Sequence, residues 1–386
     1  MTGMYHFERK KLCTLEMPAL LLLLLLVSGA LSRTVTISNV LPRQDTTGAI
    51  MNAHDGSTTR FTPNGLFYYY GMGYAMCKEN GQINGCSSCN NPRWNNTVGV
   101  WTSPDLSSGS WTYRGDALAV DSRPNCTYYR SHVVYNALTT KYVLWTNAVG
   151  CTPNAGPYVT ATSPTPTGPF IFAGSTTPTL GTGGLGDFSL YVDSTDGAGY
   201  VVLTRLPNGA GPRNMYVFRL TSDYLTIVSN VTSGILPGPN LVEAPVMFRR
   251  NGIVFVFLAG CTCFGRYGGG VAVLFSTTSP LGPYTVFSST LDPGCPMTKQ
   301  TTCFQMGPGA VCNPITQAQQ NSVIEVPTSD GGTEFVWTGD RWQDSPDGIF
   351  GHDPQTWLPL SFDSASLMPM PLQWVNNFTL NVSTQE

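Results

Sequence analysis

The 386-residue sequence is poor in charge, since Asp, Glu, Lys and Arg together make up 11% of it and its formal net charge is −3. It is rich in turn-forming residues, with 41 glycines and 29 prolines. This composition argues against a helical bundle, and the lack of a basic block argues against nucleic acid or an anionic membrane surface as partner.

The first thirty residues have the organisation of a targeting segment. The basic residues Arg9 to Lys11 precede an apolar run from Ala19 to Val27, and the small residues Ser28 to Ala30 follow it. The run is shorter than the roughly 20 apolar residues that a membrane-spanning helix needs. We predict a signal peptide at residues 1–30 and a secreted, extracellular protein without a membrane anchor.

The cysteines agree with an oxidising compartment. Ten of the eleven lie after Ala30, which is an even number and fits disulfide bonds. Cys86 and Cys89 have the spacing of half a zinc site, but no second pair stands at zinc-finger distance. We therefore predict disulfides and no metal. N-glycosylation sequons are also present, at Asn95, Asn125, Asn230, Asn377 and Asn381.

From Arg33 onward the sequence consists of short β-prone runs between turns. In five places a turn leads into aromatic and β-branched residues: Phe67–Tyr70, Tyr142–Trp145, Tyr200–Leu203, Val254–Phe257 and Phe335–Trp337. The recurrence, at roughly 55–80 residues, indicates a repeated β-sheet unit. The predicted fold class is therefore all-β: one five-bladed β-propeller domain over residues 31–386, with the tail from Asp340 to Glu386 closing the ring. A pair of β-sandwich domains is the alternative.

One hairpin carries an acid at its entrance. Leu241–Phe248 and Ile253–Leu258 are apolar runs joined by a turn at Asn251-Gly252, and Glu243 stands near the start of the first. A buried Glu can be held partly protonated, as a general acid requires. Alternatively, it can simply accept hydrogen bonds from backbone amides at a strand end.

Two further carboxylates occupy comparable positions. Asp55 and Asp187, like Glu243, each precede one of the repeated hairpins. In a propeller such positions face the axis, where like charges perturb one another. A cluster of this kind suits glycoside hydrolysis, in which one carboxylate activates water and another protonates the leaving oxygen.

Four motifs in order then point to a known family. They are Ala53-His54-Asp55-Gly56, Gly186-Asp187-Phe188, Glu243 to Phe248, and Gly339-Asp340-Arg341-Trp342. The chain thereby resembles the five-bladed propeller hydrolases of glycoside hydrolase family 43 and related clans, over about Asn52 to Trp374. The resemblance implies an inverting mechanism with Asp55 as general base, Asp187 as pKa modulator and Glu243 as general acid.

The branch that cleaves β-1,3-galactan is similar over the same motifs but differs in detail. Its members typically have Gly at the position of Asp55, and a Gln at the position of Gln320 has been implicated as a substitute base. They also tend to have Glu and Pro where this chain has Tyr129 and Ser131. The resemblance therefore leaves open the sugar, the linkage, and whether Asp55 or Gln320 is the base.

The expected substrate is an oligo- or polysaccharide, bound by a monomer. Residues expected to contact it are, from the motifs, His54, Tyr129, Arg130, Gln320, Arg341 and Trp342. Aromatic candidates for sugar stacking are Tyr74, Trp94, Tyr129, Phe264 and Trp342, each of which could instead pack between blades. No cofactor is expected, although an axial calcium near a histidine occurs in relatives. The alternative function is a lectin-like propeller that binds sugar without cleaving it.

Overall fold

The computed structural model describes Met1 and residues 31–384, apart from residues 63–64, 83–84, 88–90, 153–157, 181–182, 208–212, 262–263 and 297–311. The predicted signal peptide lies outside these residues except for Met1. The described part is all-β, with two single-turn 3-10 helices, η1 (Val120–Ser122) and η3 (Phe350–His352). None of its helices is long and apolar enough to cross a membrane.

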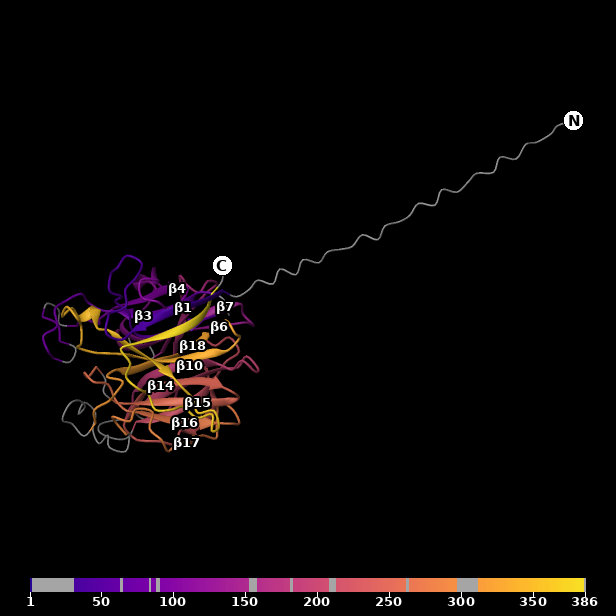
Figure 1. Ribbon diagram of the computed structural model, residues 1–386. Coiled ribbons are helices and arrows are strands. Elements are labelled where there is room, and N and C mark those ends of the chain that lie inside the picture. Colours follow the sequence, from indigo (N-terminus) through magenta and orange to yellow (C-terminus); the bar gives the residue numbers. More distant parts are fainter. Residues whose placement is uncertain are drawn as a thin grey trace.

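The strands form successive antiparallel sheets in chain order (Figure 1). The first two groups of four are β2 (His54–Arg60), β3 (Phe67–Gly73), β4 (Thr97–Ser103) and β5 (Thr112–Asp116), then β6 (Asn125–Asn136), β7 (Lys141–Thr152), β8 (Tyr158–Ser163) and β9 (Ile171–Thr176). A single parallel bridge between Gly56 and Ser131 joins these groups through β2 and β6.

Three more sheets follow. They contain β10 (Leu185–Val192), β11 (Gly199–Arg205), β12 (Asn214–Leu220) and β13 (Ile227–Ile235); β14 (Val242–Arg250), β15 (Ile253–Gly260), β16 (Val271–Ser276) and β17 (Thr285–Val286); and β18 (Gln319–Pro327), β19 (Thr333–Asp340) and β20 (Gln355–Leu360). Finally, β1 (Leu31–Ser38) pairs with β21 (Asn377–Thr384), so both ends of the described chain meet in one ribbon (Figure 1).

The first strands of the five groups contact one another in a closed cycle. β2 contacts β6, β6 contacts β10, β10 contacts β14, β14 contacts β18, and β18 contacts β2. The tail supplies β20 to the last sheet and β21 to the ribbon with β1.

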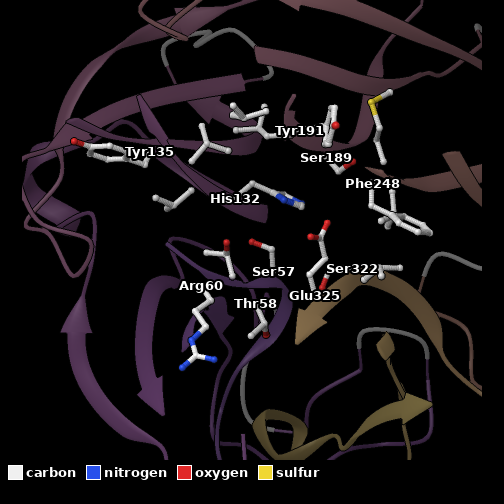
Figure 2. A pocket seen from close by; sticks show the side chains of 18 of the residues that line it. Ser57, Thr58, Arg60, His132, Tyr135, Ser189, Tyr191, Phe248, Ser322 and Glu325 are labelled. Atoms are coloured by element: carbon white, nitrogen blue, oxygen red, sulfur yellow. The ribbon is translucent and has the colours of Figure 1, made fainter. Parts of the chain in front are cut away.

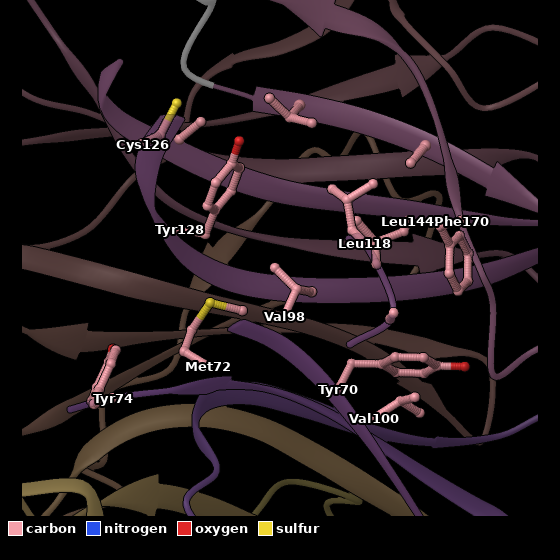
Figure 3. Close-up of a cluster of buried hydrophobic side chains, with 14 of the residues drawn as sticks. Tyr70, Met72, Tyr74, Val98, Val100, Leu118, Cys126, Tyr128, Leu144 and Phe170 are labelled. Carbon is pink, nitrogen blue, oxygen red and sulfur yellow. The ribbon is translucent and has the colours of Figure 1, made fainter. Parts of the chain in front are cut away.

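Apolar side chains pack between neighbouring groups rather than within one sheet. The cluster in Figure 3 joins the first two groups, with Tyr70 and Met72 from β3, Val98 from β4 and Leu144 from β7. Comparable clusters among the described residues lie between each later pair of neighbours and between the last group and the first. Each sheet thus has both faces covered, which accounts for strands such as β15 that are buried at every position.

The predicted hairpins are confirmed, because all five predicted runs lie in second strands of the groups: β3, β7, β11, β15 and β19. The hairpin after Glu243 shows why. Asn251 and Gly252 have φ values of 48° and 79°, the left-handed conformations of a type I′ turn, which Asn-Gly adopts readily.

Disulfides are also present, as predicted. Described pairs are Cys77–Cys86, Cys126–Cys151 and Cys295–Cys312, and Cys261 is disulfide-bonded too. Since Cys86 is oxidised, it cannot act as a zinc ligand together with Cys89, which lies outside the described residues.

Candidate active site

A β-bulge interrupts the first strand of each of the five groups near its beginning. These strands, here called the inner strands, are β2, β6, β10, β14 and β18. The register shifts fall between His54 and Ser57, Tyr129 and His132, Leu185 and Phe188, Glu243 and Val246, and Gln320 and Ser322. A bulge bends a strand and re-aims the side chains beside it. Asp55, Arg130, Asp187 and Glu243 all lie at such bulges, and this repeated irregularity builds the candidate active site.

The backbone at the first bulge is specialised. Asp55 has φ of 52°, and its amide donates a 2.6 Å hydrogen bond to Oδ2 of Asp340. A side chain at Gly56 would place its Cβ 2.0 Å from the carbonyl oxygen of Tyr70. The close approach of the Tyr70 backbone therefore requires glycine at position 56, which explains the Asp-Gly pair of the first motif.

Arg130 lies between two of the three predicted carboxylates. Its Nε lies 2.9 Å from Oδ1 of Asp55, and its Nη2 lies 3.1 Å from Oδ2 of Asp187. Its Nη1 donates to the carbonyl of Gln320 and to Oδ1 of Asn321. Because Arg130 is itself buried, this arrangement holds its guanidinium in one place. The structure thus brings Asp55 and Asp187 together through a shared cation.

The electrostatics around Asp55 favour a proton near neutral pH. Burial raises the pKa of Asp55 to about 7; Arg130 acts in the opposite direction, and Asp187 and Asp340 add to the rise. Burial also raises the pKa of Asp340 to about 6. For Arg130 burial alone would lower the pKa, but the Asp187 and Asp55 carboxylates raise it overall. One guanidinium faces three carboxyl groups, so these groups cannot all ionise freely.

Glu243 is held by a different set of side chains. Oε1 accepts a 2.9 Å hydrogen bond from Nε2 of Gln319, and Oε2 accepts one from Nη1 of Arg213. Gln319 accepts in turn, through Oε1, a 2.7 Å hydrogen bond from the indole of Trp342. An indole N–H can only donate, so Trp342 fixes which end of the Gln319 amide faces Glu243.

The surroundings of Asp55 and those of Glu243 meet at the start of β18. Gln319, which contacts Glu243, is paired across the sheet with Asp340, which contacts Asp55. Glu243 and Asp55 are therefore both anchored to one pair of cross-strand neighbours.

Gln320, the predicted alternative base, is occupied elsewhere. It is fully buried, its Nε2 donates to the carbonyls of Ala244 and Phe257, and its Oε1 accepts from the indole of Trp337. Both ends of its amide are used within the protein. Its neighbour Gln319 is the one that faces a carboxylate, because adjacent residues of a strand point to opposite sides.

The other predicted contact residues have varied environments. His54 is buried, stacks on Tyr74 with ring centroids 4.9 Å apart, and has a pKa lowered by burial to about 3. Arg341 donates to the carbonyl of Asn39 and pairs with Asp344. Trp342 is 1% exposed, so the structure uses its indole as a hydrogen-bond donor inside the protein and does not offer its face for stacking.

Among the stacking candidates, Trp94 is 43% exposed, whereas Tyr74 is buried. Tyr129 and Phe264 are half-buried and lie against each other, with ring centroids 5.7 Å apart. Trp94, Tyr129 and Phe264 are thus the stacking candidates with accessible side chains.

Four residues of this site were not predicted to act in it: Asp340, Gln319, Arg213 and Arg93. The buried Arg93 guanidinium lies 3.9 Å from the ring centroid of Phe264 and 5.3 Å from that of Trp342. Asp340 stands inside the fourth motif, so its presence there was a usable signal. The other three have no local motif, and only the register of the strands brings them in.

The residues near His54 do not fit a bound calcium. That ion takes six to eight oxygen ligands. His54 directs Nε2 to the carbonyl of Gly351, 3.1 Å away, and the described part of the chain contains no group of three or more His, Cys, Asp or Glu able to hold a metal. We therefore derive no catalytic step that uses a metal.

Carboxyl groups in separate surroundings are typical of glycosidases, and comparison with known proteins identifies the class of this chain. The family model for glycosyl hydrolases family 43 matches residues 88–336. The chain belongs to this family of glycosidases. No curated protein matches it by sequence.

Solved structures of similar fold include several family members. An exo-β-1,3-galactanase from Clostridium thermocellum has a TM-score of 0.66 and 24% identity, over 91% of this chain and 68% of that one. A family 43 β-1,3-galactosidase gives 0.65 and 21%, over 90% of this chain and 64% of its own. An exo-β-1,3-galactanase from Phanerochaete chrysosporium, crystallised with β-1,3-galactotriose, gives 0.63 and 20%, over 90% and 69%. At these identities the likeness supports the fold.

Proposed function

We propose that the protein is a secreted glycosidase that cleaves a glycosidic bond of an extracellular polysaccharide with inversion at the anomeric carbon. One observation carries the proposal: two buried carboxyl groups with different surroundings, Asp55 beside Arg130 and Glu243 beside Gln319, are anchored to the same cross-strand pair. Separate environments are what allow one carboxyl group to act as base and another as acid.

We also infer that residues 31–386 form one five-bladed propeller. The closed cycle of contacts among β2, β6, β10, β14 and β18 supports this inference, as do the apolar clusters between neighbouring sheets. The ribbon of β1 and β21 would then fasten the two ends of the ring.

In the proposed reaction Asp55 acts as general base. Its ionised carboxylate accepts a proton from water while the water oxygen attacks the anomeric carbon. Arg130 keeps the carboxylate oriented and stabilises its charge, and Asp187 holds Arg130 from the other side. Asp187, the expected pKa modulator, would thereby tune the base through Arg130.

Glu243 acts as general acid and gives its proton to the departing oxygen. Gln319 can only donate to Oε1, so the transferable proton must sit on Oε2, where Arg213 lies in the unliganded protein. We infer that the leaving group displaces Arg213 from Oε2 when substrate binds. As the glycosidic bond breaks, the leaving oxygen takes the proton of Glu243. Asp55 takes a proton from the attacking water, so the number of protons on the protein is unchanged.

The predicted signal peptide and the sequons support an extracellular polysaccharide as the substrate class. Four of the five sequon asparagines, Asn125, Asn230, Asn377 and Asn381, are exposed on the described structure, as N-glycosylation requires. β-1,3-Galactan is the first polymer to test, because the proteins of similar fold include exo-β-1,3-galactanases.

The test is hydrolysis by the purified protein of a panel of aryl glycosides and wall polysaccharides, including β-1,3-galactan, with the product anomer followed by NMR. We expect the released sugar to have the anomeric configuration opposite to that of the bond cleaved. Retention of configuration would contradict the roles of Asp55 and Glu243. Binding to a polymer that is never cleaved would instead favour the lectin-like alternative.

A further inference from the structure

The inner strands enclose a second space, on the other side of the bulges from the candidate active site. It is a cavity of about 480 Å³, here named the far cavity, and it is lined by residues C-terminal to the bulge in all five inner strands (Figure 2). Its polar lining includes Ser57, His132, Ser189, Ser322 and Glu325. None of these residues takes part in the proposed reaction.

Two of these polar side chains have an atom without a hydrogen-bond partner within the described structure. His132 and Ser189 are both more than nine-tenths buried. Nε2 of His132 and Oγ of Ser189 nevertheless have no hydrogen-bond partner. Figure 2 shows His132, Ser189 and Glu325 directed into the same space, with Arg60 at its edge pointing away. Unpaired buried groups cost free energy, so water or a ligand must satisfy them.

Glu325 dominates the chemistry of the far cavity. Its side chain is open to the cavity, and within the described ranges no basic side chain forms an ion pair with it. Enclosure by the protein raises the pKa of Glu325 to about 7. Burial lowers the pKa of His132 to about 3, so its ring is neutral at physiological pH.

The lining excludes several ligand classes. A transition metal would need a larger ligand set, and the described residues offer no cluster of three metal-binding side chains. An anion would be repelled by Glu325, and the nearby Arg60 is engaged with the carbonyls of Gly65 and Ser383. A calcium or magnesium ion is usually held by several carboxylate and carbonyl oxygens, whereas Glu325 is the one carboxylate among the described residues that line the cavity.

A neutral polyol fits the groups that line the far cavity. Its hydroxyl groups donate to a carboxylate and accept from a serine, and its C–H faces pack on aromatic rings such as those of Tyr135 and Tyr191, which also line the cavity. We propose that the far cavity is a binding site for a small neutral polyol of monosaccharide size, separate from the candidate active site. This inference does not depend on the proposed hydrolysis.

The test uses myo-inositol and D-galactose as probes of the full mature chain, with ligand-observed NMR in solution and crystal soaks to locate the sites. We expect millimolar binding, with the probe in contact with Glu325, His132 and Ser189. Glu325→Leu and Ser189→Val should each weaken binding of myo-inositol at least tenfold. Glu325→Gln keeps a hydrogen-bonding group of the same shape, so its affinity should stay within about threefold.

Matched controls keep the result interpretable. Glu334→Gln changes a carboxyl group in β19 that does not line the cavity, and it should bind the probes like the wild type. Thermal unfolding shows whether each variant is folded, and Ser189→Ala replaces Ser189→Val if the latter is not. The proposal is overturned if the soaked cavity holds only ordered water, if binding occurs at crystal concentration only, or if Glu325→Leu binds as the wild type does. Loss of binding in Glu325→Gln, with a cation found in the cavity, would also overturn it.

Discussion

The guanidinium of Arg130 joins Asp55 to Asp187, with Nε 2.9 Å from one carboxylate and Nη2 3.1 Å from the other. This single side chain links the first two sequence motifs through their carboxylates. It also sets the balance of charge in the site, because it is the cation that most opposes the effect of burial on Asp55.

We predict that Arg130→Met shifts the acidic limb of the kcat/KM profile to higher pH. Arg130 lowers the pKa of Asp55, so its removal makes the base harder to ionise. The variant should also lose about 3–5 kcal/mol of stability, the usual cost of leaving buried charges without a partner. The pH dependence of kcat/KM and denaturant unfolding measure the two effects.

Arg249→Met is the matched control for Arg130→Met. Arg249 forms a similar partly buried ion pair, with Asp193 at 2.5 Å, but lies outside the candidate site. It should lose stability and leave the pH profile unchanged. If the wild type, Arg130→Met and Arg249→Met all had the same pH dependence of kcat/KM, Arg130 would not act on the base.

The wild-type enzyme should gain activity as the pH rises toward about 7. Asp55 must be ionised to accept a proton, and burial raises its pKa to about 7. Below that value the ionised fraction falls tenfold per pH unit, so kcat/KM should fall with the same slope. Asp55→Asn should abolish this limb and lower activity by about 10²–10⁴-fold. An acidic limb below pH 5 in the wild type would contradict the assignment.

Glu243→Gln should discriminate between leaving groups. It preserves the shape of the side chain and the hydrogen bond from Gln319 but removes the transferable proton, so a substrate with a poor leaving group should lose about 10²–10⁴-fold. A dinitrophenyl glycoside, whose leaving group departs without protonation, should lose far less. Asp55→Asn is the comparison, because loss of water activation should affect both substrates alike. Equal losses for Glu243→Gln on both substrates would mean that Glu243 is not the acid.

Much of the fold and part of the site could be predicted from the sequence. Each hairpin has a local signal, such as the Asn251-Gly252 turn, and the acids at strand starts follow from those hairpins. The choice between Gln319 and Gln320 could not be predicted. It depends on the register of β18 and on its bulge, and shifting that register by one residue would exchange their directions. Arg213 was missed for the same reason, since its contact with Glu243 is entirely between sheets.

Trp342→Phe should lower activity without unfolding the protein. The change keeps an aromatic side chain but removes the donor that orients the Gln319 amide toward Glu243. A net hydrogen bond contributes about 0.5–1.5 kcal/mol, so kcat should fall roughly two- to tenfold. Gln319→Leu should have an effect at least as large. Trp357→Phe is the control, because Trp357 is also buried and donates to a glutamine, Gln355, away from Glu243. If both tryptophan variants lose the same activity, the effect is one of packing.

The loop after the fourth motif should make stability depend on pH. Asp353 is buried, accepts hydrogen bonds from the amides of Gln343 and Asp344, and shares a hydrogen bond with the side chain of Glu79. Burial and the Glu79 carboxyl raise the pKa of Asp353 to about 8. The folded state therefore holds a proton that the unfolded state releases near pH 4.

It follows that this pair stabilises the fold most at low pH, and that its contribution declines as the pH rises from about 4 to about 8. Above that range both states have released the proton, and the loss is complete. Glu79→Gln removes the neighbouring charge and should flatten this decline, so that the variant is more stable than the wild type at pH 9 but not at pH 4. Asp121→Asn, a change in an exposed carboxyl group of η1, should leave the decline in place. Denaturant unfolding at several pH values makes the measurement, and parallel curves for wild type and Glu79→Gln would show that the two carboxyl groups do not share a proton.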